Sequence, residues 1–199
     1  MPGLGYQDGV SVVLEDVVSG NTVLDDLYYM ALQHLRVDDG GSPQLEEAEI
    51  RRCVAGAVEA AENYLQKDVV PREYVLDWHR GRSLQILSGN VSDLAVTVGG
   101  GSPPTSILSQ LDVRGSPYFR GGGLRLYGSE GYHNPPRRVT FVSGFSAGAD
   151  IPGGVLSFTL AATGMLYEVR EIANVGGQRY SVIEFPTYLL DPYKTEVIA

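Results

Sequence analysis

The chain has 199 residues, 43% of them hydrophobic and 20% charged, which is an ordinary mixture for one good-sized globular domain or two small ones. Its net charge of −9 argues against a surface that grips nucleic acid, because phosphate binding requires clustered lysine and arginine. The single cysteine, Cys53, excludes an intrachain disulfide, and no apolar run approaches the roughly 20 residues that span a bilayer.

The first 20 residues are predicted to form a loose N-terminal arm. Its start is rich in glycine, and valines from Val10 onward indicate a short strand or turn at its end. The arm lacks the basic and apolar regions of a secretory signal, so a reducing cytosolic origin is expected.

Two helices are predicted to follow the arm. Apolar residues at helical spacing predict the first over about 22–36, and DDGG at 38–41 ends it. The second is predicted over about 44–67, opened by Ser42 as N-cap and Pro43 in the first turn. Small residues around Ala57 make this helix slim, which allows close packing against another helix.

Residues 72–147 have a sequence pattern typical of β structure. Short alternating or β-branched runs lie between glycine, asparagine and proline turns, and they predict about five short antiparallel strands. Two glycine triplets, at 99–101 and 121–123, enclose a segment that we expect to be a mobile loop or long hairpin over 99–123. Its candidate contacts to a neighbouring copy or a tail-side protein are Gly101, Ile107, Leu108, Leu111, Tyr118, Phe119 and Gly121.

A third helix is predicted over about 153–174, and Gly176-Gly177 ends it. The fold class is therefore α+β: a three-helix core, a central antiparallel hairpin or small sheet, and an extended C-terminal tail. One domain is expected over residues 21–177. The tail, 178–199, is apolar but broken by Pro186 and Pro192, so it should be extended and suited to a partner's groove or sheet edge. The alternative is that it folds back on its own helices.

Charge is distributed unevenly along the chain. Residues 38–49 carry five acids and no base. The 114–138 segment carries Arg114, Arg120, Arg125, Arg137 and Arg138 against the single acid Glu130. Opposed patches suit head-to-tail contact between copies, and solvated surface charge is the alternative.

No catalytic, cofactor or metal site is expected. The segment Gly144–Gly148 matches the G-x-S-x-G pattern of serine hydrolases, but that family needs a histidine after the serine, and the last histidine is His133. His34, His79 and His133 are isolated, without the paired spacing of a zinc site. Substitution of Ser146 by alanine is therefore expected to be silent.

Several segments, in order, resemble the head–tail connector (adaptor) proteins of long-tailed bacteriophages and gene transfer agents. Residues 32–39 (LQHLRVDD) resemble the family's "hLRvd" signature. An acidic loop, the 46–65 helix and the aromatic β segment follow in the family's order. The remaining similar segments are 138–145 (RVTFVSGF), 166–171 (LYEVRE) and 189–194 (LLDPYK). The chain departs from the family at 23–26 and over 99–123, so the contacts of the second segment are not carried over.

The resemblance implies a structural virion protein rather than an enzyme. Members of this family form a ring of about twelve copies under the capsid portal, extend the DNA channel and provide the attachment platform for stopper or tail-terminator proteins. DNA would pass without specific binding, no membrane is involved, and the protein would lie in the virion neck after assembly in the bacterial cytoplasm. Carried over by position, portal binding falls on Tyr188, Leu189, Leu190, Asp191, Pro192 and Tyr193. Deleting 186–199 is expected to leave the domain folded and to abolish portal binding.

Two other functions fit the residues less well. A tail-completion or stopper protein of the same particle is disfavoured by the three-helix frame, since such proteins are expected to be mainly β. A β-rich ligand-binding domain, for sugars for example, would use Trp78 and the tyrosines, but Trp78 lies in a predicted strand and is expected to be buried.

Overall fold

The computed structural model describes residues 10–18, 20, 22–36, 44–79, 83–86, 90–98, 105–106, 108, 111–116, 123–127, 137–175 and 184–194. The chain divides into two compact units. The sheet unit holds the described residues of 1–20 and 66–144, and the helical unit holds those of 21–65 and 145–194.

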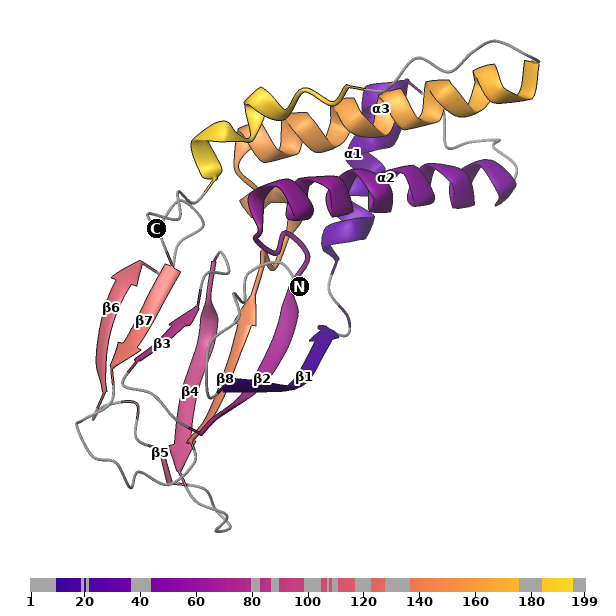
Figure 1. The fold of residues 1–199 in the computed structure, drawn as a ribbon. Helices are drawn as coiled ribbons and strands as arrows, with labels where there is room; N and C mark the ends of the chain where they lie inside the picture. Colours follow the sequence, from indigo (N-terminus) through magenta and orange to yellow (C-terminus); the bar gives the residue numbers. More distant parts are fainter. Residues whose placement is uncertain are drawn as a thin grey trace. The chain divides into compact units, whose positions relative to one another are not determined.

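Two antiparallel sheets make up the sheet unit (Figure 1). The first has the order β1-β2-β8-β4-β5, and its strands are β1 (Val10–Val17), β2 (Arg72–Trp78), β8 (Arg137–Ser143), β4 (Ser92–Val98) and β5 (Thr105–Ser106). The second has the order β3-β7-β6, formed by β3 (Ser83–Ile86), β7 (Gly123–Tyr127) and β6 (Asp112–Ser116).

The two sheets pack face to face over one apolar core. Strand β2 buries Tyr74, Leu76 and Trp78, while the residues between them lie on the opposite face, as the alternation of a strand requires. The same core contains the buried residues of the second sheet, Leu84, Ile86, Leu124 and Leu126. Because the sheets share this core, their outer faces point away from each other.

The helical unit is built on three long helices. They are α1 (Val23–Leu35), α2 (Gln44–Leu65) and α3 (Gly153–Val175). α2 and α3 lie side by side, and α1 crosses both (Figure 1). A Cβ built on Gly56 would lie 3.5 Å from Leu166 of α3, so the slim part of α2 is used for packing within the chain.

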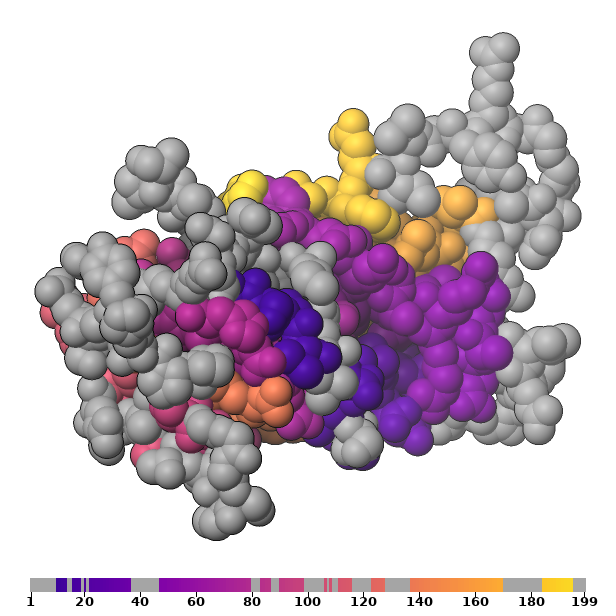
Figure 2. All heavy atoms as spheres, turned by 60° about the horizontal axis from the view of Figure 1, so that its bottom comes forward, coloured from indigo at the N-terminus to yellow at the C-terminus, as the bar shows by residue number. Residues whose placement is uncertain are grey.

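The outer face of α2 forms a broad part of the surface (Figure 2). One stripe at helical spacing is exposed, formed by Ala48, Arg52, Ala55, Glu59 and Asn63. Among the described helices, none is long and apolar enough to cross a membrane.

The mixture of helices with antiparallel sheets confirms the coarse fold prediction. The β portion is larger than the predicted hairpin or small sheet, because the arm contributes β1 and the expected loop over 99–123 contributes β5 and β6. The helical part also exceeds three helices, since the 3-10 helices η2 (Gly148–Asp150), η3 (Thr187–Leu189) and η4 (Asp191–Tyr193) join it. Residues 21–177, which were predicted as one domain, are divided between the two compact units.

Lys67 is buried, with 1% of its surface exposed, and burial lowers its pKa from 10.5 to about 8. The unfolded chain therefore binds more protons than the folded chain between these two values, so the free energy of unfolding should rise with pH over that window. We expect this rise in urea denaturation of the wild type and its loss in Lys67→Met. Equal pH dependence in the two proteins would contradict the assignment to Lys67.

Candidate protein interaction site

The predicted portal-binding residues lie in a segment that folds as turns, whereas an extended chain was expected. Residues 184–194 contain η3 and η4, with backbone hydrogen bonds from Leu190 N to Thr187 O (2.8 Å) and from Tyr193 N to Leu190 O (2.9 Å). Pro192 stands in the first turn of η4, where its missing N–H costs no hydrogen bond. The prolines therefore prevent a long helix but permit two short ones.

Apolar contacts hold this segment on the helical unit. Leu190 is fully buried and Tyr193 is 6% exposed. The rings of Phe185 and Phe158 meet edge to face with centroids 6.0 Å apart, which joins the segment to α3. The alternative in which the tail folds back on its own helices is therefore observed for residues 184–194.

Polar contacts fix the same segment to the end of α2 and the start of α3. The Tyr64 hydroxyl donates to Asp191 Oδ1 at 2.5 Å, and this bond raises the pKa of Tyr64. The Lys194 ammonium lies 4.6 Å from the centre of the Tyr64 ring, a cation–π contact. At α3, the Gly154 N–H donates to the Tyr193 hydroxyl at 3.4 Å.

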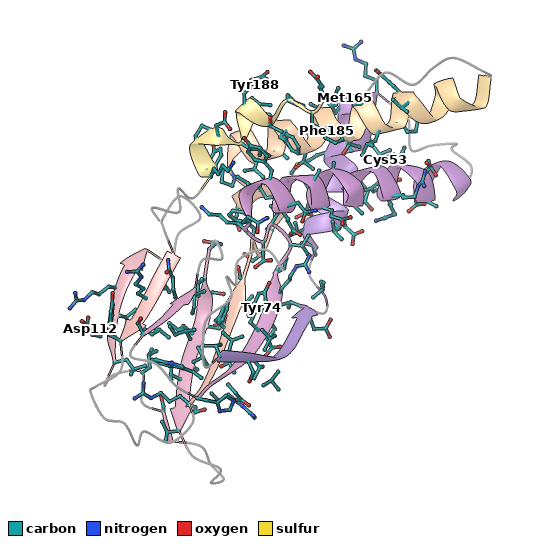
Figure 3. The ribbon with its side chains drawn as sticks, viewed as in Figure 1. Cys53, Tyr74, Asp112, Met165, Phe185 and Tyr188 are labelled. Atoms are coloured by element: carbon teal, nitrogen blue, oxygen red, sulfur yellow. The ribbon has the colours of Figure 1, made fainter. Side chains whose placement is uncertain are left out.

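The segment separates the six predicted residues into an inner and an outer set. Tyr188 is 70% exposed and points away from α3 (Figure 3). Asp191 and Pro192 are also exposed, Leu189 is half-buried, and Leu190 and Tyr193 face the helices. The surface available to a partner in this conformation is therefore centred on Tyr188, and the two buried residues position it.

The candidate contacts within 99–123 are only partly described. Leu108 and Leu111 pack against the sheet core and so serve the fold. Gly101, Ile107, Tyr118, Phe119 and Gly121 lie outside the described residues, and their partner contact stays a prediction.

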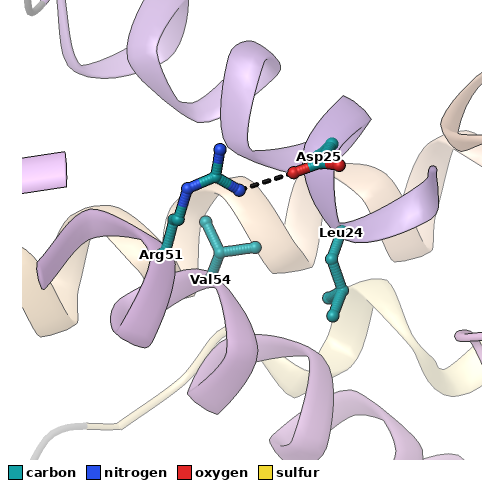
Figure 4. Close-up of a pocket in the computed structure, with 4 residues that line it drawn as sticks. All are labelled: Leu24, Asp25, Arg51 and Val54. Carbon is teal, nitrogen blue, oxygen red and sulfur yellow. Dashed lines mark hydrogen bonds and ion pairs between the residues drawn. The ribbon is translucent and has the colours of Figure 1, made fainter. Parts of the chain in front are cut away.

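A hollow of about 330 Å³ lies between α1 and α2, lined by Leu24, Asp25, Arg51 and Val54 (Figure 4). Arg51 donates to Asp25 at 2.6 Å and to Glu47 at 3.0 Å, and these bonds raise its pKa. The guanidinium also lies 4.2 Å from the centre of the Tyr28 ring. Arg51 therefore links the two helices, and its hydrogen bonds are used within the chain.

The basic segment 114–138 does not form one patch among its described residues. Arg138 pairs with Asp77 at 2.9 Å, and the pair lowers the pKa of Asp77. Arg137 is 7% exposed, lies 4.7 Å from the centre of the Trp78 ring, and has its pKa lowered by burial. Trp78 itself is 2% exposed, so it belongs to the core and offers no stacking platform for a sugar.

The serine of the hydrolase-like motif has a structural partner. Ser146 donates its hydroxyl to Asp150 at 3.2 Å, across the turn that begins η2. His79 is hydrogen-bonded to Ser11, at 3.2 Å. In the described part of the chain, no group of three or more histidine, cysteine, aspartate or glutamate side chains could hold a metal ion.

Solved structures share this fold over nearly the whole chain. One is a chain of "Neck of empty GTA particle computed with C6 symmetry", with a TM-score of 0.64 and 17% identity. A second comes from "Virion of native gene transfer agent (GTA) particle" (TM-score 0.63, 15% identity), and a third from "Neck of native GTA particle computed with C12 symmetry" (0.60, 15%). Each match covers 92% of this chain and 96% of the other. No family model and no curated protein matches the chain.

Sequence reasoning missed two residues that position the C-terminal segment, Tyr64 and Gly154. A Cβ on Gly154 would lie 2.7 Å from Leu189 O and 2.7 Å from Tyr193 Cε2, so only glycine fits there. Paired glycines in the first turn of a helix were the available signal, because glycine is otherwise unfavourable in a helix.

Gly154→Ala is therefore expected to displace residues 184–194 and to lower the free energy of unfolding by roughly 1–3 kcal/mol. Chemical denaturation would measure the loss, and limited proteolysis would show cleavage within the segment. Gly153→Ala is the matched control, since a Cβ there meets nothing within 4 Å. That variant should match or slightly exceed the wild type, by up to about 1 kcal/mol. Equal behaviour of the two variants would contradict the docked segment.

Proposed function

We propose that this chain is a structural neck protein of a phage-like particle, a head–tail adaptor that forms a ring of about twelve copies under the capsid portal. Its partners are the portal protein, neighbouring copies, and a stopper or tail-terminator protein. Genomic DNA passes through the channel without specific binding. The single observation that carries the proposal is the fold shared with chains of gene transfer agent particles and necks over 92% of this chain.

The portal contact is assigned to the segment 184–194 in its docked form, with Tyr188 as the central side chain. An exposed tyrosine on a segment anchored by Leu190 and Tyr193 is pre-organised, so little conformational entropy is lost on binding. Tyrosine is also among the residues that carry most binding energy in interfaces. A ring repeats the contact once per copy, so each individual contact can be weak.

Electron microscopy of the purified chain mixed with its particle's portal protein tests the proposal. We expect ring density under the portal for the wild type and its loss, or at least about a tenfold weaker association, for Tyr188→Ala. Tyr29→Ala is the matched control, because Tyr29 is another exposed tyrosine (56%) and lies on α1.

The outcomes separate the parts of the proposal. Ring density with Tyr188→Ala equal to the wild type would move the portal contact elsewhere and leave the adaptor function in place. Association with a tail-side protein but not with the portal would replace the adaptor with a stopper or tail-completion protein. No association with either would overturn the neck function.

A further inference from the structure

Two pairs of like charges lie directly opposite each other on neighbouring strands of the sheet unit. On the first sheet, Asp16 of β1 is opposite Glu73 of β2. On the second sheet, Arg114 of β6 is opposite Arg125 of β7. All four residues are exposed, and like charges directly across a strand pair destabilise a sheet.

The acidic pair lies on the outer face of the first sheet. Glu73 alternates with the buried Tyr74, so it points away from the core, and Asp16 shares its face as its direct partner. Val142, directly opposite Glu73 on β8, and Val75 are half-buried on the same face. The acids therefore border a partly apolar surface, the arrangement typical of protein interfaces.

The basic pair lies on the outer face of the second sheet. Arg125 alternates with the buried Leu124 and Leu126, so its side chain points away from the core, as does that of Arg114 opposite it. Arg114 contacts Asp112 (2.6 Å) and the Tyr127 ring (5.1 Å), and Arg125 donates to Gln85 (3.1 Å). An exposed ion pair such as Arg114–Asp112 contributes little, so it is easily exchanged for an intermolecular one.

We propose that the Asp16–Glu73 face of one copy binds the Arg114–Arg125 face of the next copy. The two faces are complementary in charge, and contact would relieve the repulsion within each pair. They also point away from each other within one sheet unit, so the contact is head-to-tail, and head-to-tail contacts build rings. Two arginines on a chain of net charge −9 match an acidic protein face better than the many phosphates of DNA. The inference deepens the proposed ring and rests on it.

Charge reversal with complementation tests the contact on the full chain. One variant carries Asp16→Lys and Glu73→Lys, and the other carries Arg114→Glu and Arg125→Glu. Alone, each sets like charges against like, and we expect at least about a tenfold weaker self-association by native mass spectrometry and sedimentation. Mixed in equal amounts, the two variants restore opposite charges at every contact, and assemblies containing both should form. High salt should weaken them, because exposed charges are screened.

The control variant Glu59→Lys with Glu168→Lys makes the same change in net charge as Asp16→Lys with Glu73→Lys, but at exposed helical positions, and it should associate as the wild type does. A mixture that associates no more than either variant alone would overturn the contact, including the case in which the arginines bind phosphate instead. If the wild type forms rings under the portal but the mixed variants do not associate, this contact would be rejected and the adaptor function would stand. Complementation without portal rings would retain the contact and reject the adaptor function.

Discussion

Leu190→Ala is expected to lower the free energy of unfolding by roughly 2–5 kcal/mol, the cost of removing a fully buried leucine side chain and leaving a cavity. Leu190 is 0% exposed and lies between η3 and η4, so the loss should appear in the whole helical unit rather than in a frayed terminus. Urea denaturation followed by circular dichroism measures it. The size of the effect matters because a typical domain is stable by only about 5–15 kcal/mol.

The matched control for Leu190→Ala is Tyr188→Ala, two residues away in the same segment. Tyr188 is 70% exposed, so its truncation should change stability by no more than about 0.5 kcal/mol. If the segment were extended and contacted only a partner, neither substitution would change the free energy of unfolding of the isolated chain. A Leu190→Ala protein as stable as the wild type would therefore reject the docked conformation of 184–194.

The docked segment also changes what a deletion can show. Removal of 186–199 takes away Leu190 and Tyr193 together, and it exposes the apolar surface of the helices that they cover. If that deletion abolished portal binding, the loss could come from the missing contact or from the lower stability of the chain. Single exposed substitutions such as Tyr188→Ala separate the two causes.

Sequence periodicity located the long helices because each buries a stripe that repeats along its own chain. The observed α1, α2 and α3 begin and end within about two residues of the predicted bounds. The strands β5 and β6 within 99–123 were missed because they are short, of 2 and 5 residues, and stand among the glycines, prolines and serines that are typical of loops. Turn residues alone do not reveal strand pairing.

The basic segment illustrates what strand alternation could have predicted. Arg137 and Arg138 are neighbours in sequence and were grouped in one patch. In β8 they point to opposite faces, one onto buried Trp78 and the other to Asp77. Because side chains alternate between the two faces of a strand, the sequence alone could have placed Arg137 and Arg138 on opposite faces. Burial of Leu190, in contrast, depends on how α2 and α3 pack, and no local pattern in 184–194 records it.

Gly144→Ala is the second substitution with a large expected effect. Gly144 directly follows β8 and has a φ of +114°, a conformation that residues with a side chain rarely adopt, and a Cβ would lie 2.6 Å from Val70 O and 2.8 Å from Pro71. The backbone strain costs about 1–3 kcal/mol and the collision about as much again, so we expect a loss of roughly 2–6 kcal/mol. Thermal unfolding of the purified variant measures it.

Gly20→Ala separates the two causes of that loss. Gly20 also has a positive φ, +76°, but a Cβ there meets nothing within 4 Å, so only the backbone strain applies. Gly144 is constrained further because its carbonyl accepts a hydrogen bond from Asn90 at 3.0 Å, and the Pro71 carbonyl beside it accepts one from Val18 at 3.0 Å. The backbone therefore cannot move aside for a methyl group without breaking these bonds. Equal losses of stability from both substitutions would mean that the backbone around Gly144 moves aside for the methyl group. Backbone strain alone would then explain why glycine is needed at position 144.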